Sequence, residues 1–160
     1  MAWTKNGTPL TLGSTADDLD ITDLTAKKFN VFLIHLIQTG AANLRQTFND
    51  NTNSVYARRV SYRGGTDSTS VSQANLDIDI DENNDEFHIQ YCCSISTEEK
   101  LGIGWVITRS TAGAGTFPDR QEYVYKFVPS PDADVTRIDL NNTSAGSYDT
   151  NTNISALGTD

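Results

Sequence analysis

Residues 75–87 read NLDIDIDENNDEF, and the alternation in this stretch decides the fold class. Three aspartates alternate with three aliphatic residues: Asp77, Asp79 and Asp81 with Leu76, Ile78 and Ile80. Successive side chains of a β-strand point to opposite faces. The pattern therefore predicts a strand with one face on a core and the other in water.

The same alternation recurs along the chain, with turn-forming Gly, Pro, Asn and Asp between the segments. Such segments are found at residues 10–13, 18–24, 43–50, 55–63, 86–96, 100–110, 120–128 and 135–140. Thr, Ser and Asn make up more than a quarter of the chain, which suits strands and turns. The sequence therefore predicts an all-β fold, an antiparallel β-sandwich of jelly-roll type.

Several segments give more specific expectations. Residues 27–40, KKFNVFLIHLIQTG, are apolar on both parities, which predicts a central strand covered on both faces. Residues 66–73 are polar and predict a loop or an edge strand, while the segments on either side of residues 83–85 predict a hairpin. Residues 1–140 would form the β-sandwich domain, and residues 141–160 a polar C-terminal arm that becomes ordered against a neighbour.

Charge and cysteine content limit the classes of partner. The chain has 21 acidic and 12 basic residues, a net charge of −9 that repels a phosphate backbone and argues against nucleic-acid binding. The longest apolar run, residues 31–37, is too short to span a bilayer, and the first residues lack the apolar core of a secretion signal. Cys92 and Cys93 are adjacent, so we expect one buried thiol and one on the opposite strand face, without a disulfide framework. These features predict folding in a reducing compartment, with neither membrane nor nucleic acid as a partner.

The acidic strand suggests either a solvated face or a cation site. Carboxylates on alternate residues lie roughly 6.5–7 Å apart and do not converge on one small cation, so the solvated face is favoured. The loop that follows leaves Asp81 and Asp85 as candidate calcium ligands. No catalytic motif is present, and two lone histidines do not define a site; we expect His35 in the core or an interface and His88 at the surface. The sequence therefore predicts a protein that is not an enzyme and has no cofactor beyond this candidate calcium.

A second candidate site lies in residues 45–63, where arginines, aromatics and amides gather in an otherwise acidic chain. The candidate glycan or interface residues are Arg45, Phe48, Asn49, Tyr56 and Arg58. In one interpretation, which we favour, the arginines pair with the acidic strands within the protomer or across an interface. In the other, the aromatics and amides form a surface that binds a glycan or a receptor.

Blocks along most of the chain resemble a group of small virion proteins of tailed phages and archaeal viruses. The similar blocks are WTKNGTPLTLGSTADDLDITDL, FNVFLIHLIQTG, FNDNTNSVYARR, TAGAGTFPDRQEYVYKF and TRIDLNNTSAGSY. The chain departs from the group at Asn51-Thr52, where a Gly-rich turn is common, and at Phe117 before Pro118. The resemblance implies a virion component, assembled in the host cytoplasm, rather than a defined enzymatic activity.

Together these observations predict a viral structural protein, such as a capsid, decoration or tail component. Its partners would be copies of itself and other virion proteins, and it would act through self-association. The alternative is a carbohydrate- or receptor-binding module on the virion that recognises a host-surface glycan.

Overall fold

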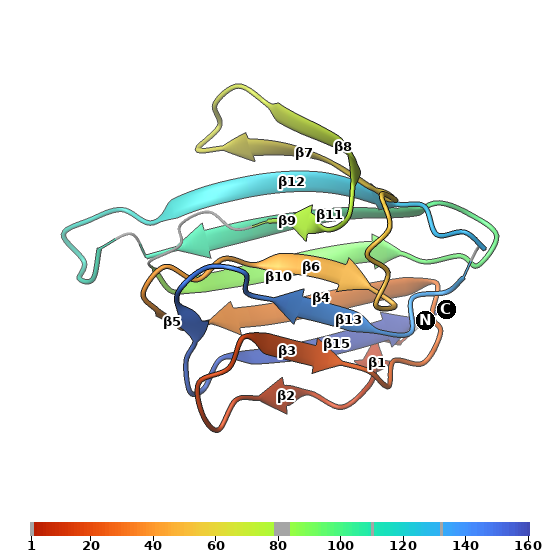
Figure 1. Cartoon of the computed structure of the whole chain (residues 1–160), viewed down its shortest axis with the longest axis horizontal. Helices are drawn as coiled ribbons and strands as arrows, with labels where there is room; N and C mark the ends of the chain where they lie inside the picture. The colour runs from red at the N-terminus through yellow and green to blue at the C-terminus, as the bar shows by residue number, and fades with distance from the viewer. Residues whose placement is uncertain (1, 79–83, 110, 132) are drawn as a thin grey trace.

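The computed structural model describes residues 2–78, 84–109, 111–131 and 133–160. Within these residues the regular structure consists of strands alone, which pair antiparallel in three sheets (Figure 1). The predicted all-β class and antiparallel pairing are thus confirmed. Residues 79–83, which contain three of the six acidic residues in the stretch 75–87, lie outside the described residues.

The large sheet has nine strands in the order β1-β15-β4-β10-β11-β12-β7-β8, and β2 also pairs with β15. Their bounds are β1 (Thr4–Lys5), β2 (Leu10–Thr11), β4 (Phe29–Leu36), β7 (Tyr56–Tyr62), β8 (Ser68–Gln73), β10 (Glu86–Cys93), β11 (Lys100–Thr108), β12 (Asp119–Phe127) and β15 (Asn153–Thr159). The small sheet has the order β3-β13-β6-β9, with bounds β3 (Asp18–Ile21), β13 (Ile138–Asn141), β6 (Arg45–Phe48) and β9 (Leu76–Asp77). A short third sheet pairs β5 (Gln38–Thr39) with β14 (Ser147–Tyr148).

The large and small sheets share one core. Phe48 of β6 contacts the large sheet, with its ring centroid 6.0 Å from that of Phe32 on β4 and 5.6 Å from that of Phe127 on β12. The accessible surface of the chain is 7885 Å², and a compact monomer of 17.5 kDa is expected to expose roughly 7,900 Å². The chain therefore buries a full core without help from a partner.

Two glycines on the inner side of β11 allow close packing. Gly102 lies opposite Tyr125 of β12 and Gly104 opposite Tyr123, and a Cβ at either glycine would lie about 2 Å from the tyrosine ring. Both tyrosines are buried. The glycines thus leave room for two aromatic rings.

Polar side chains line the inner face of β10. His88 is fully buried, with its Nε2 2.8 Å from Glu86 Oε2, and Gln90 Nε2 donates to the Tyr125 hydroxyl at 2.5 Å. The expectation that His88 is exposed is therefore wrong, because its parity on β10 is that of the core. Cys92 follows on the same face and is buried, while Cys93 lies on the other, as predicted.

Residues 141–160 do not form a polar arm, so that prediction is wrong. β15 lies between β1 and β4 in the large sheet and pairs with β4 along its whole length. Ile154 and Ala156 point inward and are buried. The segment reads as polar because Asn153 and Ser155 occupy the outward parity.

The predicted hairpin of residues 74–96 is also wrong. β9 pairs with β6 in the small sheet, whereas β10 pairs with β4 and β11 in the large sheet. Both segments place apolar or buried residues on alternate positions, and the alternation does not say which sheet receives them. The polar segment of residues 66–73 does form an edge strand, β8.

Candidate interaction surface

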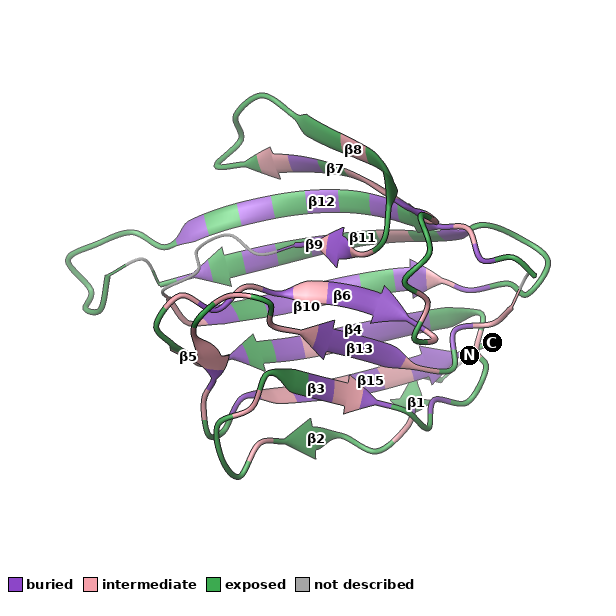
Figure 2. Cartoon of the chain, in the orientation of Figure 1, coloured by how far each residue is buried: buried purple, intermediate pink, exposed green. Residues whose placement is uncertain are grey.

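The outer side of the large sheet carries a broad set of exposed apolar side chains. Along β10, β11 and β12 buried and exposed residues alternate (Figure 2), so one parity faces the core and the other faces solvent. Eight large apolar residues on the outer parity are between 40% and 57% exposed, and we call them the apolar face: Phe29, Phe87, Tyr91, Leu101, Ile103, Trp105, Ile107 and Val124.

The apolar face is continuous across adjacent strands. On the outer side Ile89 of β10 lies opposite Leu33 of β4 and Trp105 of β11. The next outward residue of β10, Tyr91, lies opposite Ile103, and its ring meets Trp105 edge-on with centroids 6.2 Å apart. The outward residues of β4, β10 and β11 include no Asp, Glu, Lys or Arg along the described strands. The one polar ring among these outward residues is that of His35, at the end of β4.

The size of the apolar face distinguishes it from ordinary surface. At about 150–250 Å² for a large side chain and with these exposed fractions, the eight residues present roughly 700 Å². The largest apolar patch on a typical monomer is about 300–600 Å². A standard protein–protein interface takes about 800 Å² from each partner. The face is therefore large enough for a stable interface.

Charged residues flank the apolar face on β7 and β12, and they pair within the chain. Lys126 contacts Glu99 at 3.2 Å, and Arg120 contacts Glu122 at 3.3 Å. These pairs are largely exposed, so each contributes little to stability. They give the surface a polar rim with both signs of charge beside an apolar centre, as protein interfaces commonly have.

A pocket of about 370 Å³ opens at one end of the apolar face. Trp3, from the N-terminal segment, forms one wall, and the other lining residues come from the start of β4, the end of β10 and the start of β11. These lining residues are Phe29, Asn30, Tyr91, Cys92, Cys93, Leu101, Gly102 and Ile103. We call this cavity the Trp3 pocket.

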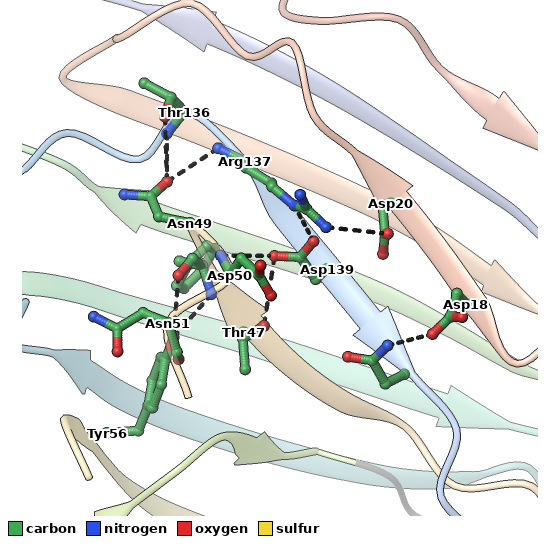
Figure 3. A network of polar contacts seen from close by, with 12 residues as sticks. Asp18, Asp20, Thr47, Asn49, Asp50, Asn51, Tyr56, Thr136, Arg137 and Asp139 are labelled. Carbon is green, nitrogen blue, oxygen red and sulfur yellow. Dashed lines mark hydrogen bonds and ion pairs between the residues drawn. The ribbon is translucent and has the colours of Figure 1, made fainter. Parts of the chain in front are cut away.

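The outer side of the small sheet is polar, and Figure 3 shows how its groups are held. Asp139, only 3% exposed, lies at the centre and accepts from Arg137 Nε and from the backbone nitrogen of Asp50 at 3.1 Å. Arg137 also contacts Asp20 at 3.4 Å. Burial and the nearby Asp139 carboxylate raise the pKa of Asp20, while the hydrogen bond to Asp139 raises the pKa of Arg137. This polar face is a network closed within the chain.

Two of the predicted glycan residues, Phe48 and Tyr56, belong to the core, with exposures of 0% and 1%. The Tyr56 hydroxyl accepts from Phe48 N and donates to Asn51 O, both at 2.9 Å, and so closes the turn between β6 and β7. Asn49 Oδ1 accepts from the backbone nitrogens of Thr136 and Arg137. The prediction that these side chains contact a glycan is wrong for the two aromatics, because neither is accessible. Asn49 also stabilises the fold, through its contacts with the backbone of Thr136 and Arg137.

The two predicted arginines both lie next to Asp77 of β9. Arg58 of β7 pairs with Asp77 of β9 at 3.1 Å, which confirms charge pairing with the acidic strand for this residue. Arg45 lies on β6, opposite Asp77 and Asn141 in the register of the small sheet. Because Phe48 and Tyr56 are buried, the five predicted residues do not form one binding surface.

The predicted calcium ligands are only partly described. Asp81 lies outside the described residues, and Asp85 contacts Arg109 at 3.2 Å. Among the described residues, no group of three or more His, Cys, Asp or Glu side chains is arranged to hold a metal ion. Calcium binding at Asp81 and Asp85 remains a prediction, and a melting temperature that a chelator leaves unchanged would remove it.

Sequence reasoning missed the apolar face, although a signal was available. Residues 86–93 and 100–108 place their large apolar side chains on one parity and polar residues or glycine at most positions of the other, whereas residues 29–36 are apolar on both parities. For residues 27–40 that pattern predicted a strand covered on both faces, yet Phe29 is 40% exposed and His35 is exposed on the outer side of β4. Within the described chain the outer face of β4 is covered only in part, since Val31 on that face is 7% exposed.

Searches of protein-family models, of curated proteins and of solved structures each found no match to this chain. The described residues contain no helix with the length and apolar character needed to cross a membrane.

Proposed function

We propose that this protein is a viral structural protein, a capsid, decoration or tail component, that assembles with copies of itself through its apolar face. The observation that supports this most strongly is an apolar surface of roughly 700 Å², larger than the patches a monomer usually exposes, on a chain that already buries a full core. Such a surface marks an interaction site, and burying it drives association.

A second copy is the occupant that the chemistry favours. The centre of the apolar face lacks charged side chains, so its partner must present an equally apolar and extended surface. Two copies stacked through this face would resemble the aligned packing of two sheets, with side chains filling a layer about 10 Å thick. The net charge of −9 on each copy opposes association, so burial of the apolar face must outweigh this repulsion.

The strand order supports the jelly-roll part of the proposal. In a jelly roll, two interlocked Greek keys place the first, eighth, third and sixth strands in one sheet and the second, seventh, fourth and fifth in the other. The small sheet runs β3-β13-β6-β9, which fits the first set in chain order. The large sheet fits the second set if β10, β11 and β12 together occupy the seventh place between β4 and β7. Jelly rolls are common in viral capsids.

The virion setting rests on the resemblance of the sequence to small virion proteins. A virion contains many copies of one chain in close contact, and an apolar face suits such an assembly. Two cysteines without a disulfide agree with assembly in the host cytoplasm.

The second candidate function is glycan binding on the virion. Three aromatic residues, Trp3, Tyr91 and Trp105, are 40–46% exposed on or beside one sheet face, and jelly rolls also occur in lectins. A glycan site needs polar groups that fix the sugar hydroxyls. Because the centre of the apolar face has few such groups, we rank this function second.

Sedimentation velocity over a range of concentrations tests self-association. We expect the wild-type chain to form oligomers and Trp105→Glu to sediment as a monomer, because a buried unpaired carboxylate opposes assembly. Thr22→Glu adds the same charge at an exposed position after β3 and should sediment like wild type. A wild-type chain that stays monomeric at millimolar concentration would overturn the proposal, and specific glycan-array signals from that monomer would favour the second function.

A further inference from the structure

One exposed aromatic residue lies apart from the apolar face. The loop of residues 111–118 joins β11 to β12 and carries Phe117, whose exposure of 76% exceeds that of every other large apolar residue described. In Figure 1 this loop extends past the end of the large sheet, on the side away from the chain termini. A partner that covers this ring would remove its apolar surface from water, which is favourable.

The Trp3 pocket lies at the opposite end of the same strands. On β11, Leu101 lines the pocket, whereas Thr108 lies opposite Asp119, where the chain returns from the loop. Seven residues of strand separate these two positions, a distance of about 24 Å. Phe117 therefore lies far from the pocket of its own chain.

We propose that Phe117 of one copy occupies the Trp3 pocket of a second copy, and that the second copy returns the same contact. The two copies then meet through their apolar faces with strands antiparallel, around a two-fold axis that lies in the interface and perpendicular to the strands. This inference deepens the proposed function and rests on self-association through that face.

The two-fold arrangement follows from where the two features lie. A rotation that exchanges the ends of β11 and β12 brings the loop of each copy over the pocket end of the other, so both contacts form together and the assembly closes. A head-to-tail contact would fill one pocket per copy but leave most of the apolar face in water. The two-fold pairing covers both the face and the loop.

The pocket suits the ring chemically. Its walls include Trp3, Tyr91 and Ile103, and its volume of about 370 Å³ exceeds that of one aromatic side chain. With the ring of Phe117 added, each copy contributes close to the roughly 800 Å² of a standard interface. A buried aromatic residue in a pocket is the usual form of an interface hot spot.

A native thiol makes the contact directly testable. Cys93 lines the Trp3 pocket, while Cys92 is buried, and burial raises the pKa of its thiol to about 12. Treating Phe117→Cys with oxidised glutathione should therefore produce a covalent dimer on a non-reducing gel. Mass spectrometry should find position 117 linked to Cys93. Adding Cys93→Ser should abolish the dimer, and Val71→Cys, an equally exposed site on edge strand β8, should not link to Cys93.

Sedimentation of Phe117→Ser separates this inference from the proposed function. We expect dimerisation at least tenfold weaker than wild type, with unchanged melting of the monomer, because the loop contributes nothing to the core. The Phe117 contact would be overturned if Phe117→Ser associates as tightly as wild type and Phe117→Cys forms no disulfide with Cys93. If Trp105→Glu is still monomeric in that case, assembly through the apolar face stands. A ladder of linked species beyond the dimer would overturn the two-fold arrangement. A monomeric wild-type chain would overturn both proposals.

Discussion

The two outer faces of this protein differ in how their side chains find partners. On the small sheet the outward residues of β3 and β13, among them Asp20 and Asp139, are bound by Arg137 and by backbone groups of the same chain. On the large sheet the outward residues of β11, such as Ile103 and Trp105, remain 41% and 40% exposed. Both faces show the same alternation. The difference lies in which residue types occupy the outward parity.

This contrast shows how intramolecular and intermolecular contacts can be divided between two layers. A polar group that loses water must be hydrogen-bonded, and on the polar face the chain meets that need by itself for most groups, with Asp20 Oδ1 as an exception. Apolar side chains need only to be covered, and any apolar surface of suitable shape can cover them. We therefore expect substitutions on the polar face to lower folding stability and substitutions on the apolar face to lower association.

The largest effect on folding stability is expected on β11, because one side of this strand packs in the core and the other side belongs to the apolar face. Gly104→Val places side-chain atoms against the buried ring of Tyr123 and should lower the free energy of unfolding by about 3 kcal/mol. Ile103→Val, one residue away on the outer side, should change it by less than about 0.5 kcal/mol. Urea unfolding measures both, and equal effects would show that the two faces of β11 are wrongly assigned.

The sequence predicted the strands well because alternation is a local property. It did not predict which sheet each strand joins. Leu76 of β9 and Cys92 of β10 both point into the core, but from different sheets, and nothing within either segment records that. β15 was missed for a related reason, since its inward residues Ile154 and Ala156 are few and small.

The candidate site was predicted less well than the fold. Phe48 and Tyr56 have polar neighbours in sequence and therefore read as surface aromatics, yet both rings pack in the core against Phe127. The informative signal was the outward parity of β4, β10 and β11, which carries large apolar residues such as Leu33, Tyr91 and Trp105. An apolar parity indicates a covered face, but it cannot say whether the cover comes from the same chain.

An intermediate effect on folding stability is expected for substitutions on the polar face. Asp139→Ala removes the acceptor of Arg137 Nε and of the Asp50 backbone, and should cost about 2 kcal/mol of unfolding free energy. Asp18→Ala, an exposed aspartate on the neighbouring strand β3, should cost less than about 0.5 kcal/mol. Both variants should associate like wild type by sedimentation. Loss of association in Asp139→Ala without loss of stability would mean that the polar face, too, is an interface.

The smallest effect tests whether every carboxylate on the polar face is stabilising. Burial and the Asp139 carboxylate raise the pKa of Asp20, and its Oδ1 has no hydrogen-bond partner. A carboxyl group whose pKa is raised in the folded state favours folding when protonated, so at pH 7 the charged form of Asp20 costs stability. We therefore expect Asp20→Asn to raise the melting temperature at neutral pH by an amount on the order of 1 °C.

The pH dependence of the melting-temperature difference shows whether it comes from the charge of Asp20. As the pH falls through the folded pKa of Asp20 towards the unfolded value of about 3.9, the wild-type carboxyl group becomes neutral and the advantage of Asp20→Asn should disappear. Thermal melts of the two proteins between pH 3 and pH 7 measure this difference, with Asp18→Asn as the matched exposed control. A lower melting temperature for Asp20→Asn at pH 7 would mean that its contact with Arg137 outweighs the cost of burial. In that case the polar face would be stabilised by all of its charges, and its contrast with the uncharged centre of the apolar face would be sharper still.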